Sequence, residues 1–148
     1  MVHVVETDHA GMINKFLGDG FMALFGVGDR PGHADEALHA AQAIQAALVT
    51  LNHAAVARGQ LAVGIGIGLH SGPVVVGSIG SPERLEYTAI GSTVNLASRV
   101  ESLTKQLAEP LLLTAATREL LRESVALRDL GPHSIRGMSA PVALFALA

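Results

Sequence analysis

Cysteine and tryptophan are absent from this 148-residue chain, and aromatic residues make up only 3% of it. Without cysteine the chain can form neither a disulfide nor a thiolate metal site. The absence fits a cytoplasmic setting, either for the chain alone or for the cytosolic part of a larger protein. With so few aromatics, the core must be built from alanine, valine, leucine and isoleucine within a hydrophobic fraction of 49%.

The chain also lacks an excess of positive charge, a long apolar run and a secretory leader. Its formal net charge of −3 gives no support for a basic nucleic-acid groove. No apolar run reaches the length of a membrane span, and the charged start at residues 1–6 lacks a signal-peptide pattern. No linker, low-complexity tract or repeat divides the chain. We therefore predict one domain over residues 1–148, with neither nucleic acid nor membrane as a partner.

Residues 87–101 are the stretch around which the rest of the chain is organised. They predict a short strand, a turn at Gly91 and then a helix. Ser92 or Thr93 is expected to cap the helix by accepting hydrogen bonds from its free N–H groups. One face of this helix should pack into the core through the apolar stripe Val94, Ala97, Val100 and Leu103.

Asn95 and Arg99 lie four residues apart and therefore project from one face of the same helix. The planar guanidinium of Arg99 suits phosphate oxygens, and the amide of Asn95 can both donate and accept a hydrogen bond. The pair is suited to gripping a phosphorylated ligand while charge shifts during a reaction. The alternative is an ordinary solvated helix face.

Residues 12–25 predict a β-hairpin, with strands at 12–16 and 21–25 and a tight turn at 17–20. Asp19 lies in that turn. It is either a turn former that bonds its own backbone or a hard oxygen ligand for a divalent cation. Lys15, on the first strand, would by itself be a solvated lysine.

Residues 61–70 alternate large apolar residues with glycine and predict a strand. One face would carry the apolar side chains. The opposite face, bare at Gly64, Gly66 and Gly68, would let another backbone, a partner chain or a ligand approach closely. A second strand at 73–80 is expected to pair with it, and residues 81–84 are expected to form a loop.

The remaining pattern mixes helices with antiparallel hairpins, which favours an α+β fold with helices packed on a mixed, mainly antiparallel sheet. Thr114 is a candidate cap for one of the helices. The other expected elements are helices at 33–58 and 115–123 and strands at 109–114, 125–129, 133–136 and 141–147.

Three blocks of sequence carry a family resemblance. They are residues 15–26 (KFLGDGFMALFG), residues 66–77 (GIGLHSGPVVVG), and residues 86–91 with 94–99 (EYTAIG and VNLASR). Together, and in this order, they resemble the signature of class III nucleotidyl cyclases, the adenylyl and guanylyl cyclase catalytic domains. The resemblance covers nearly the whole chain and implies the ferredoxin-like cyclase fold.

The resemblance also implies a reaction. Members of this family convert a nucleoside triphosphate to a 3′,5′-cyclic monophosphate and pyrophosphate, using two divalent ions, Mg²⁺ or Mn²⁺. Asp19 matches one of the metal ligands. Each site is built by two facing protomers, one giving the metal carboxylates and the other giving the remaining residues. A homodimer, or a heterodimer with another cyclase domain, is therefore the expected assembly.

By the same resemblance, Lys15 and Thr88 are the residues that select the purine. Lysine with threonine or aspartate suits adenine, whereas guanylyl enzymes typically carry glutamate and cysteine at these places. ATP is therefore the expected substrate and cyclic AMP, an intracellular signal, the expected product. Threonine at position 88 resembles the bacterial threonine-bearing adenylyl subclass.

Three further residues match positions that contact the ribose and the phosphates. Asn95 is expected to orient the ribose, and Arg99 to stabilise the charge that develops on the phosphates. Arg136 matches a basic residue on the terminal phosphates. Its local motif, residues 135–137, is short, and the alternative is a surface charge.

The chain departs from the family in one respect. The family carries a second metal aspartate on a first strand, well upstream of the hairpin that holds Lys15, and no match to that strand occurs here. Glu6 and Asp8 lie too close to Lys15 to replace it. We expect the first strand of the fold to be missing and catalysis to be impaired.

The alternative function is a non-catalytic nucleotide-binding or dimerisation module. A diguanylate cyclase is disfavoured because its Gly-Gly-Asp/Glu-Glu-Phe motif is absent.

Overall fold

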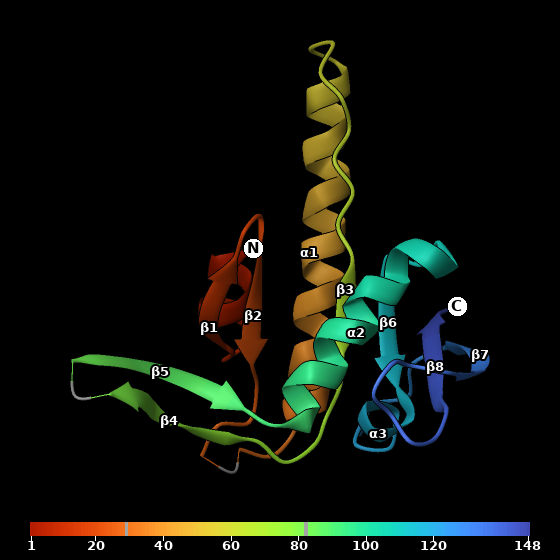
Figure 1. Ribbon diagram of the computed structural model, residues 1–148. Helices are drawn as coiled ribbons and strands as arrows, with labels where there is room; N and C mark the ends of the chain where they lie inside the picture. The colour runs from red at the N-terminus through yellow and green to blue at the C-terminus, as the bar shows by residue number, and fades with distance from the viewer. Residues whose placement is uncertain (29, 82) are drawn as a thin grey trace.

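The computed structural model describes residues 1–28, 30–81 and 83–148, with only the backbone described at Arg84. Two long helices, α1 (His33–Val56) and α2 (Ser92–Leu107), form most of its helical structure (Figure 1). A short π-helical turn, η1 (Val4–Asp8), precedes the first strand, and a one-turn helix, α3 (Ala115–Arg118), follows the sixth. The strands are β1 (Met12–Leu17), β2 (Gly20–Leu24), β3 (Ile67–Leu69), β4 (Val75–Ser81), β5 (Arg84–Ile90), β6 (Leu111–Thr114), β7 (Leu127–His133) and β8 (Val142–Leu147).

The strands form one four-stranded sheet and two antiparallel ribbons. The sheet has the order β3-β6-β8-β7, in which β3 and β6 are parallel and the other pairs antiparallel. The ribbons are β1-β2 and β4-β5, and the second projects away from the sheet (Figure 1). The predicted α+β class with mixed strand directions is confirmed.

The core lies on both faces of β6, whose four residues are all buried. Successive side chains of a strand point to opposite faces. Leu112 therefore packs with Leu96 and Val100 of α2, whereas Leu111 packs on the other face with Leu38 and Ala41 of α1. Each fully buried leucine contributes about 1.5–3 kcal/mol relative to an exposed one. The two helices are thereby fixed on opposite sides of the sheet.

The C-terminal half of α1 projects beyond the sheet, and the segment after it returns along the helix (Figure 1). The apolar side chains of Leu51 and Val56 are more than half exposed there. The amide of Asn52 ties the return segment down, because it donates to the Val63 carbonyl at 2.8 Å and accepts from the Val63 N–H at 2.9 Å. Among the described residues, no helix combines the length and apolar character that a bilayer crossing requires.

The strand predicted at 61–70 is correct only at Ile67–Leu69. Alternation of side chains predicts an extended backbone, but a strand also requires a neighbour with which to form hydrogen bonds. The neighbour is β6, which has only four residues and pairs with Ile67–Leu69 alone. Residues 61–66 therefore stay outside the sheet.

The prediction that the segment at 73–80 pairs with the strand before it is wrong. β4 pairs with β5 instead, in a register that joins Val75 to Ile90 and Ser81 to Arg84. The chain leaves the sheet after β3, so the turn at Ser71 and Gly72 does not close a hairpin. The loop predicted at 81–84 is shorter than expected, and Pro82 lies outside the described residues.

Two further expectations near the C-terminus are corrected. Instead of strands at 125–129 and 133–136 there is one strand, β7, with an irregular register between Asp129 and Gly131. The helix predicted at 115–123 ends at Arg118, and the backbone N–H groups of Arg122 and Glu123 donate to the carboxylate of Asp35. The strand predicted at 141–147 is confirmed as β8.

Candidate active site

The turn between β5 and α2 requires glycine. Gly91 precedes the helix with φ of +149°, a region that side chains disfavour. Neither Ser92 nor Thr93 caps the helix by a side-chain hydrogen bond, contrary to the prediction. The hydroxyl of Thr93 instead donates to the Pro73 carbonyl at 2.7 Å, which ties the start of α2 to the chain before β4.

The buried face of α2 is rotated from the predicted apolar stripe. Val100 is buried and Leu103 packs against the same cluster, as predicted, whereas Val94 and Ala97 are only half-buried. The rotation follows from close packing on β3, where a Cβ on Gly68 would overlap the backbone of Glu101. The expected close approach to the glycine face is therefore made by α2. The most buried residues of the helix are Thr93, Leu96, Val100 and Thr104.

Arg99 is held by the loop after β7. Its guanidinium donates to the Arg136 carbonyl, and a Cβ on Gly137 would lie 2.5 Å from Arg99 Nη1. Among the described residues, no carboxylate pairs with Arg99. One donor of the guanidinium is used and its charge is uncompensated, so its other N–H groups can bind an anion.

Substitution of Gly137 by alanine is therefore expected to act on Arg99. Gly137 has φ of +75°, so Gly137→Ala should destabilise the fold by about 1–2 kcal/mol and displace the guanidinium. Gly131→Ala is a matched control, since Gly131 has φ of +78° but open space around its Cβ position. Thermal unfolding should show a similar loss of stability for both variants. An assay of the expected nucleotide cyclisation should show loss of activity for Gly137→Ala alone, and equal losses in both variants would contradict the expectation.

The two residues predicted to select the purine lie on two neighbouring strands. Thr88, on β5, is only 6% exposed, and Lys15, on β1, is half-buried. Asn14 joins the two strands, because the Thr88 hydroxyl donates to its Oδ1 at 3.1 Å and its Nδ2 donates to the Tyr87 carbonyl at 3.3 Å. The structure thus brings the two strands of this pair together.

Asp19 lies exposed in the turn between β1 and β2, next to Gly18 with φ of +66°. The described residues contain no cluster of three histidine, aspartate or glutamate side chains that could hold a metal ion. One carboxylate is too little for a resident metal site. Mg²⁺ is, however, commonly held by one or two carboxylates together with substrate phosphates. Asp19 therefore fits a cation that arrives with a nucleotide.

Apart from Asp19, the predicted residues fall into two groups within one chain. Lys15 and Thr88 belong to the joined strands, while Asn95, Arg99 and Arg136 gather around the N-terminal half of α2. Asn95 and Arg136 are exposed, and among the described residues no side-chain hydrogen bond links one group to the other.

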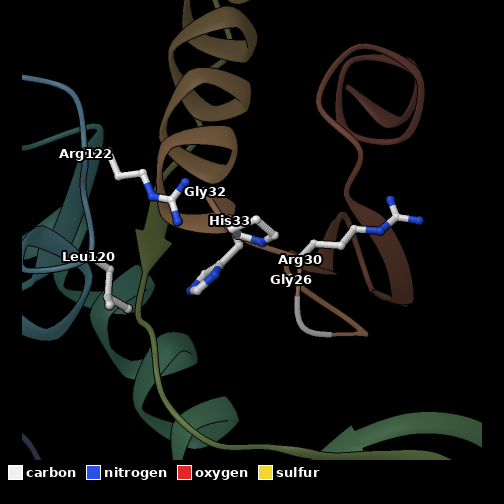
Figure 2. A pocket seen from close by; sticks show the side chains of 7 residues that line it. Gly26, Arg30, Gly32, His33, Leu120 and Arg122 are labelled. Atoms are coloured by element: carbon white, nitrogen blue, oxygen red, sulfur yellow. The ribbon is translucent and has the colours of Figure 1, made fainter.

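A cavity of about 340 Å³ opens at the start of α1. In Figure 2 the guanidinium of Arg122 and the ring of His33 lie near Gly32, while Arg30 points away. None of the predicted site residues lines this cavity. The predicted site therefore lies outside this cavity, with Asp19, Asn95 and Arg136 exposed and Thr88 buried.

His70, at the end of the glycine-rich stretch, has a structural role in this chain. Its Nδ1 lies 2.9 Å from the Thr114 hydroxyl, and the Ser71 hydroxyl donates to Thr117 at 3.1 Å. Burial lowers the pKa of His70 below its ordinary value of 6.5. The folded chain therefore keeps this imidazole neutral at a pH where the unfolded chain would protonate it.

Stability should consequently fall as the pH is lowered from about 7 through the ordinary histidine pKa of about 6.5. The unfolded state binds the extra proton in this range, which favours unfolding, and the loss ends below the folded-state pKa. Urea unfolding at several pH values measures the effect. His70→Gln should flatten the profile relative to the exposed control His53→Gln. A slope unchanged by His70→Gln would assign the effect to other groups.

Comparisons with known proteins agree with this fold. Residues 3–148 match the family described as the adenylate and guanylate cyclase catalytic domain. Adenylate cyclase 1 of Rhizobium meliloti is 36% identical over 143 residues, which is 95% of this chain and 21% of that protein. The chain therefore spans about a fifth of the length of that relative.

Two solved structures are also similar. The adenylyl cyclase CyaB from P. aeruginosa matches with a TM-score of 0.86 and 31% identity, over 97% of this chain and 74% of that one. The guanylyl cyclase Cya2 matches with a TM-score of 0.80 and 31% identity, over 99% of this chain and 78% of that one. The chain belongs to the adenylate and guanylate cyclase catalytic domain family.

Proposed function

We propose that this protein is an adenylate cyclase that converts ATP to 3′,5′-cyclic AMP and pyrophosphate. The observation that carries the proposal is the joining of β1 and β5 through Asn14, which holds the strands of Lys15 and Thr88 side by side. Lysine and threonine at these places suit adenine, and the adenylate cyclase of Rhizobium meliloti is among the relatives. The similarity to a guanylyl cyclase makes the purine a necessary part of the test.

The reaction forms a bond from the ribose 3′-oxygen to the α-phosphorus and breaks the bond from that phosphorus to the β-phosphate oxygen. The 3′-hydroxyl proton is released and pyrophosphate leaves. Asn95 orients the ribose through its amide. Arg99 stabilises the negative charge that grows on the phosphate oxygens, with a guanidinium already positioned by the Arg136 carbonyl. The Arg136 side chain binds the terminal phosphates.

Cyclase domains of this family use divalent metal ions. In this proposal Asp19 would hold a Mg²⁺ or Mn²⁺ ion, which would supply neutralisation of phosphate charge and activation of the attacking oxygen. The exposed position of Asp19 at a hairpin turn lets a partner's nucleotide reach it.

We further propose that two protomers build each site. Large apolar side chains beside the predicted residues support this, because contiguous exposed apolar surface is typical of interaction sites. Phe16 and Leu17, which follow Lys15, are 66% and 55% exposed, and Tyr87, which precedes Thr88, is 54% exposed. Asp19 would then serve the site whose other residues come from the facing protomer, in a homodimer or in a pair with another cyclase domain.

The first experiment is incubation of the purified protein with ATP and Mg²⁺ or Mn²⁺, followed by chromatographic detection of cyclic AMP. The proposal is supported if the wild-type protein forms cyclic AMP and the Arg99→Ala variant does not. GTP in parallel tests the purine. A protein that produces cyclic GMP in preference to cyclic AMP would refute the adenylyl assignment.

The second experiment tests the shared site by mixing two inactive variants, Asp19→Ala and Arg99→Ala. If each site takes Asp19 from one protomer and Arg99 from the other, a mixed dimer has one intact site and one doubly mutated site. Equal mixing should restore about a quarter of the wild-type activity. No restoration in mixtures shown to contain mixed dimers would place both residues in the same protomer's site.

A second candidate function is a non-catalytic nucleotide-binding or dimerisation module. The observation that favours it is the lack of a three-residue metal cluster among the described residues, which leaves one carboxylate at the predicted site. This function predicts ATP binding by calorimetry, or dimer formation by sedimentation, without cyclic AMP at any metal concentration.

A further inference from the structure

The strand that carries Lys15 contains an irregularity at the preceding residue. Ile13 pairs with Ala23 and Lys15 pairs with Met22, so Asn14 is an extra residue without a partner on β2. Such a β-bulge disturbs the alternation of side chains and re-aims one of them, and bulges are common next to active sites. Here the bulge directs the side chain of Asn14 to β5, where it contacts Tyr87 and Thr88.

The two contacts fix the orientation of the Asn14 amide. The Tyr87 carbonyl oxygen can only accept a hydrogen bond, so the group 3.3 Å from it must be the NH₂ of Asn14. The Asn14 carbonyl oxygen therefore faces the Thr88 hydroxyl at 3.1 Å. Two acceptors would face each other at Tyr87 if the amide were reversed.

The amide orientation in turn fixes the hydroxyl of Thr88. A hydroxyl has one hydrogen to donate and two lone pairs that accept. Because Asn14 Oδ1 can only accept, the hydrogen of Thr88 is committed to it, and Thr88 can offer a further partner only a lone pair. Thr88 is 6% exposed, so water competes little for this hydrogen.

Space for such a partner exists on the same face of the ribbon. Gly77 lies directly opposite Thr88, and directly opposed residues share a face. A Cβ at Gly77 would meet no heavy atom within 4 Å among the described residues. The space next to Gly77, on the face that it shares with Thr88, is therefore not filled by the described part of the chain.

We propose that Asn14 is a positioning residue that holds Thr88 as a hydrogen-bond acceptor and so selects a purine with an amino group at its six position. Adenine presents an N–H donor there, which an acceptor binds, whereas guanine presents a carbonyl oxygen, which an acceptor repels. This inference rests on the proposed function, in which Thr88 contacts the purine. It adds that Asn14 determines the polarity of that contact.

The test compares ATP with GTP in wild-type protein and in two variants of Asn14. Asn14→Ala frees the Thr88 hydrogen to point at a ligand, so the ratio of the kcat/KM values for ATP and GTP should fall about 5- to 10-fold. Asn14→Asp loses the hydrogen bond to the Tyr87 carbonyl and should cost some stability, but it keeps an acceptor facing Thr88 and should retain the ATP preference. Competition of the two nucleotides for a fluorescent ATP analogue gives the same ratio without requiring turnover.

Asn52→Ala is the matched control, since it removes an asparagine that also makes two hydrogen bonds between segments, far from the predicted site. It should lower stability and leave the ATP:GTP ratio unchanged. In a Thr88→Val background, Asn14→Ala should no longer alter the ratio, because Asn14 acts through Thr88.

The outcomes separate this inference from the proposed function. A wild-type protein that prefers ATP, with a ratio unchanged in Asn14→Ala or equally reduced in Asn14→Asp or Asn52→Ala, would overturn the role of Asn14 alone. A wild-type protein that binds neither nucleotide and makes no cyclic product would overturn the proposed function and this inference with it. Equal binding of both nucleotides by the wild-type protein would refute the polarity argument directly.

Discussion

Arg99→Ala is expected to lower kcat for cyclic AMP formation by about 100-fold or more, with little change in KM. A pre-positioned donor that meets growing charge contributes more in the transition state than in the bound substrate. Arg99 meets this description, because its guanidinium is held by the Arg136 carbonyl and no described carboxylate neutralises it. Asn95→Ala should follow the same pattern with a smaller loss. Steady-state kinetics with ATP and Mn²⁺ measure both constants.

Arg58→Ala is a suitable control, because Arg58 is an exposed arginine in the turn after α1. It removes an equal charge and should change neither constant. If Arg99→Ala raised KM and left kcat unchanged, Arg99 would bind ground state and transition state equally, and its assigned role would be wrong.

The elements that sequence predicts well are those with local signals. The Gly-Asp-Gly turn between two apolar runs places β1 and β2, and the alanine-rich helical period places α1 from His33. In both cases the residues that determine the structure are neighbours along the chain. The same holds for α2, whose start is set by the conformation of Gly91.

Strand pairing is the part of the fold that local signals cannot supply. The alternating stretch at 61–70 predicts a strand with a hairpin partner, yet β3 pairs in parallel with β6, which lies beyond α2 in the chain. The choice depends on Gly68, whose missing side chain lets α2 pack directly on β3. The bare glycine face predicts a close approach, but the pattern does not specify that α2 is the element that approaches it, because that contact is tertiary.

In the candidate site, too, some residues can be identified from the sequence, whereas others depend on how the strands pair. The family resemblance implies roles for Lys15, Asp19 and Thr88, and both these roles and the convergence of the three residues across two protomers stay predictions. The sequence does not indicate a role for Asn14, because in a regular strand the side chains of Asn14 and Lys15 would lie on opposite faces of the hairpin. The bulge that re-aims it arises from the register of two strands, so a single strand's sequence carries no signal for it.

Lys15→Glu combined with Thr88→Cys is expected to shift the preference from ATP to GTP, lowering the kcat/KM ratio of ATP to GTP by about 100-fold. The lysine ammonium donates to the unprotonated N1 of adenine. Guanine carries a hydrogen on N1 and an amino group at the two position, both of which a glutamate accepts. A thiol is a weaker hydrogen-bond donor than a hydroxyl, so Asn14 should hold the hydrogen of a cysteine at position 88 less firmly, and that hydrogen can turn to the six-position oxygen of guanine. Initial rates of cyclic AMP and cyclic GMP formation measure the shift.

The matched control is Lys105→Glu, which makes the same charge reversal on an exposed lysine in the last turn of α2. It should leave the ratio unchanged, because Lys105 is not one of the two residues proposed to select the purine. The single variants should each reduce ATP use without creating efficient GTP use. Either change alone leaves a hydrogen-bond donor facing a donor, or an acceptor facing an acceptor, between the protein and each purine. A double variant that still prefers ATP as strongly as the wild-type protein would show that the purine is recognised elsewhere. The contact between Asn14 and Thr88 would then be structural only.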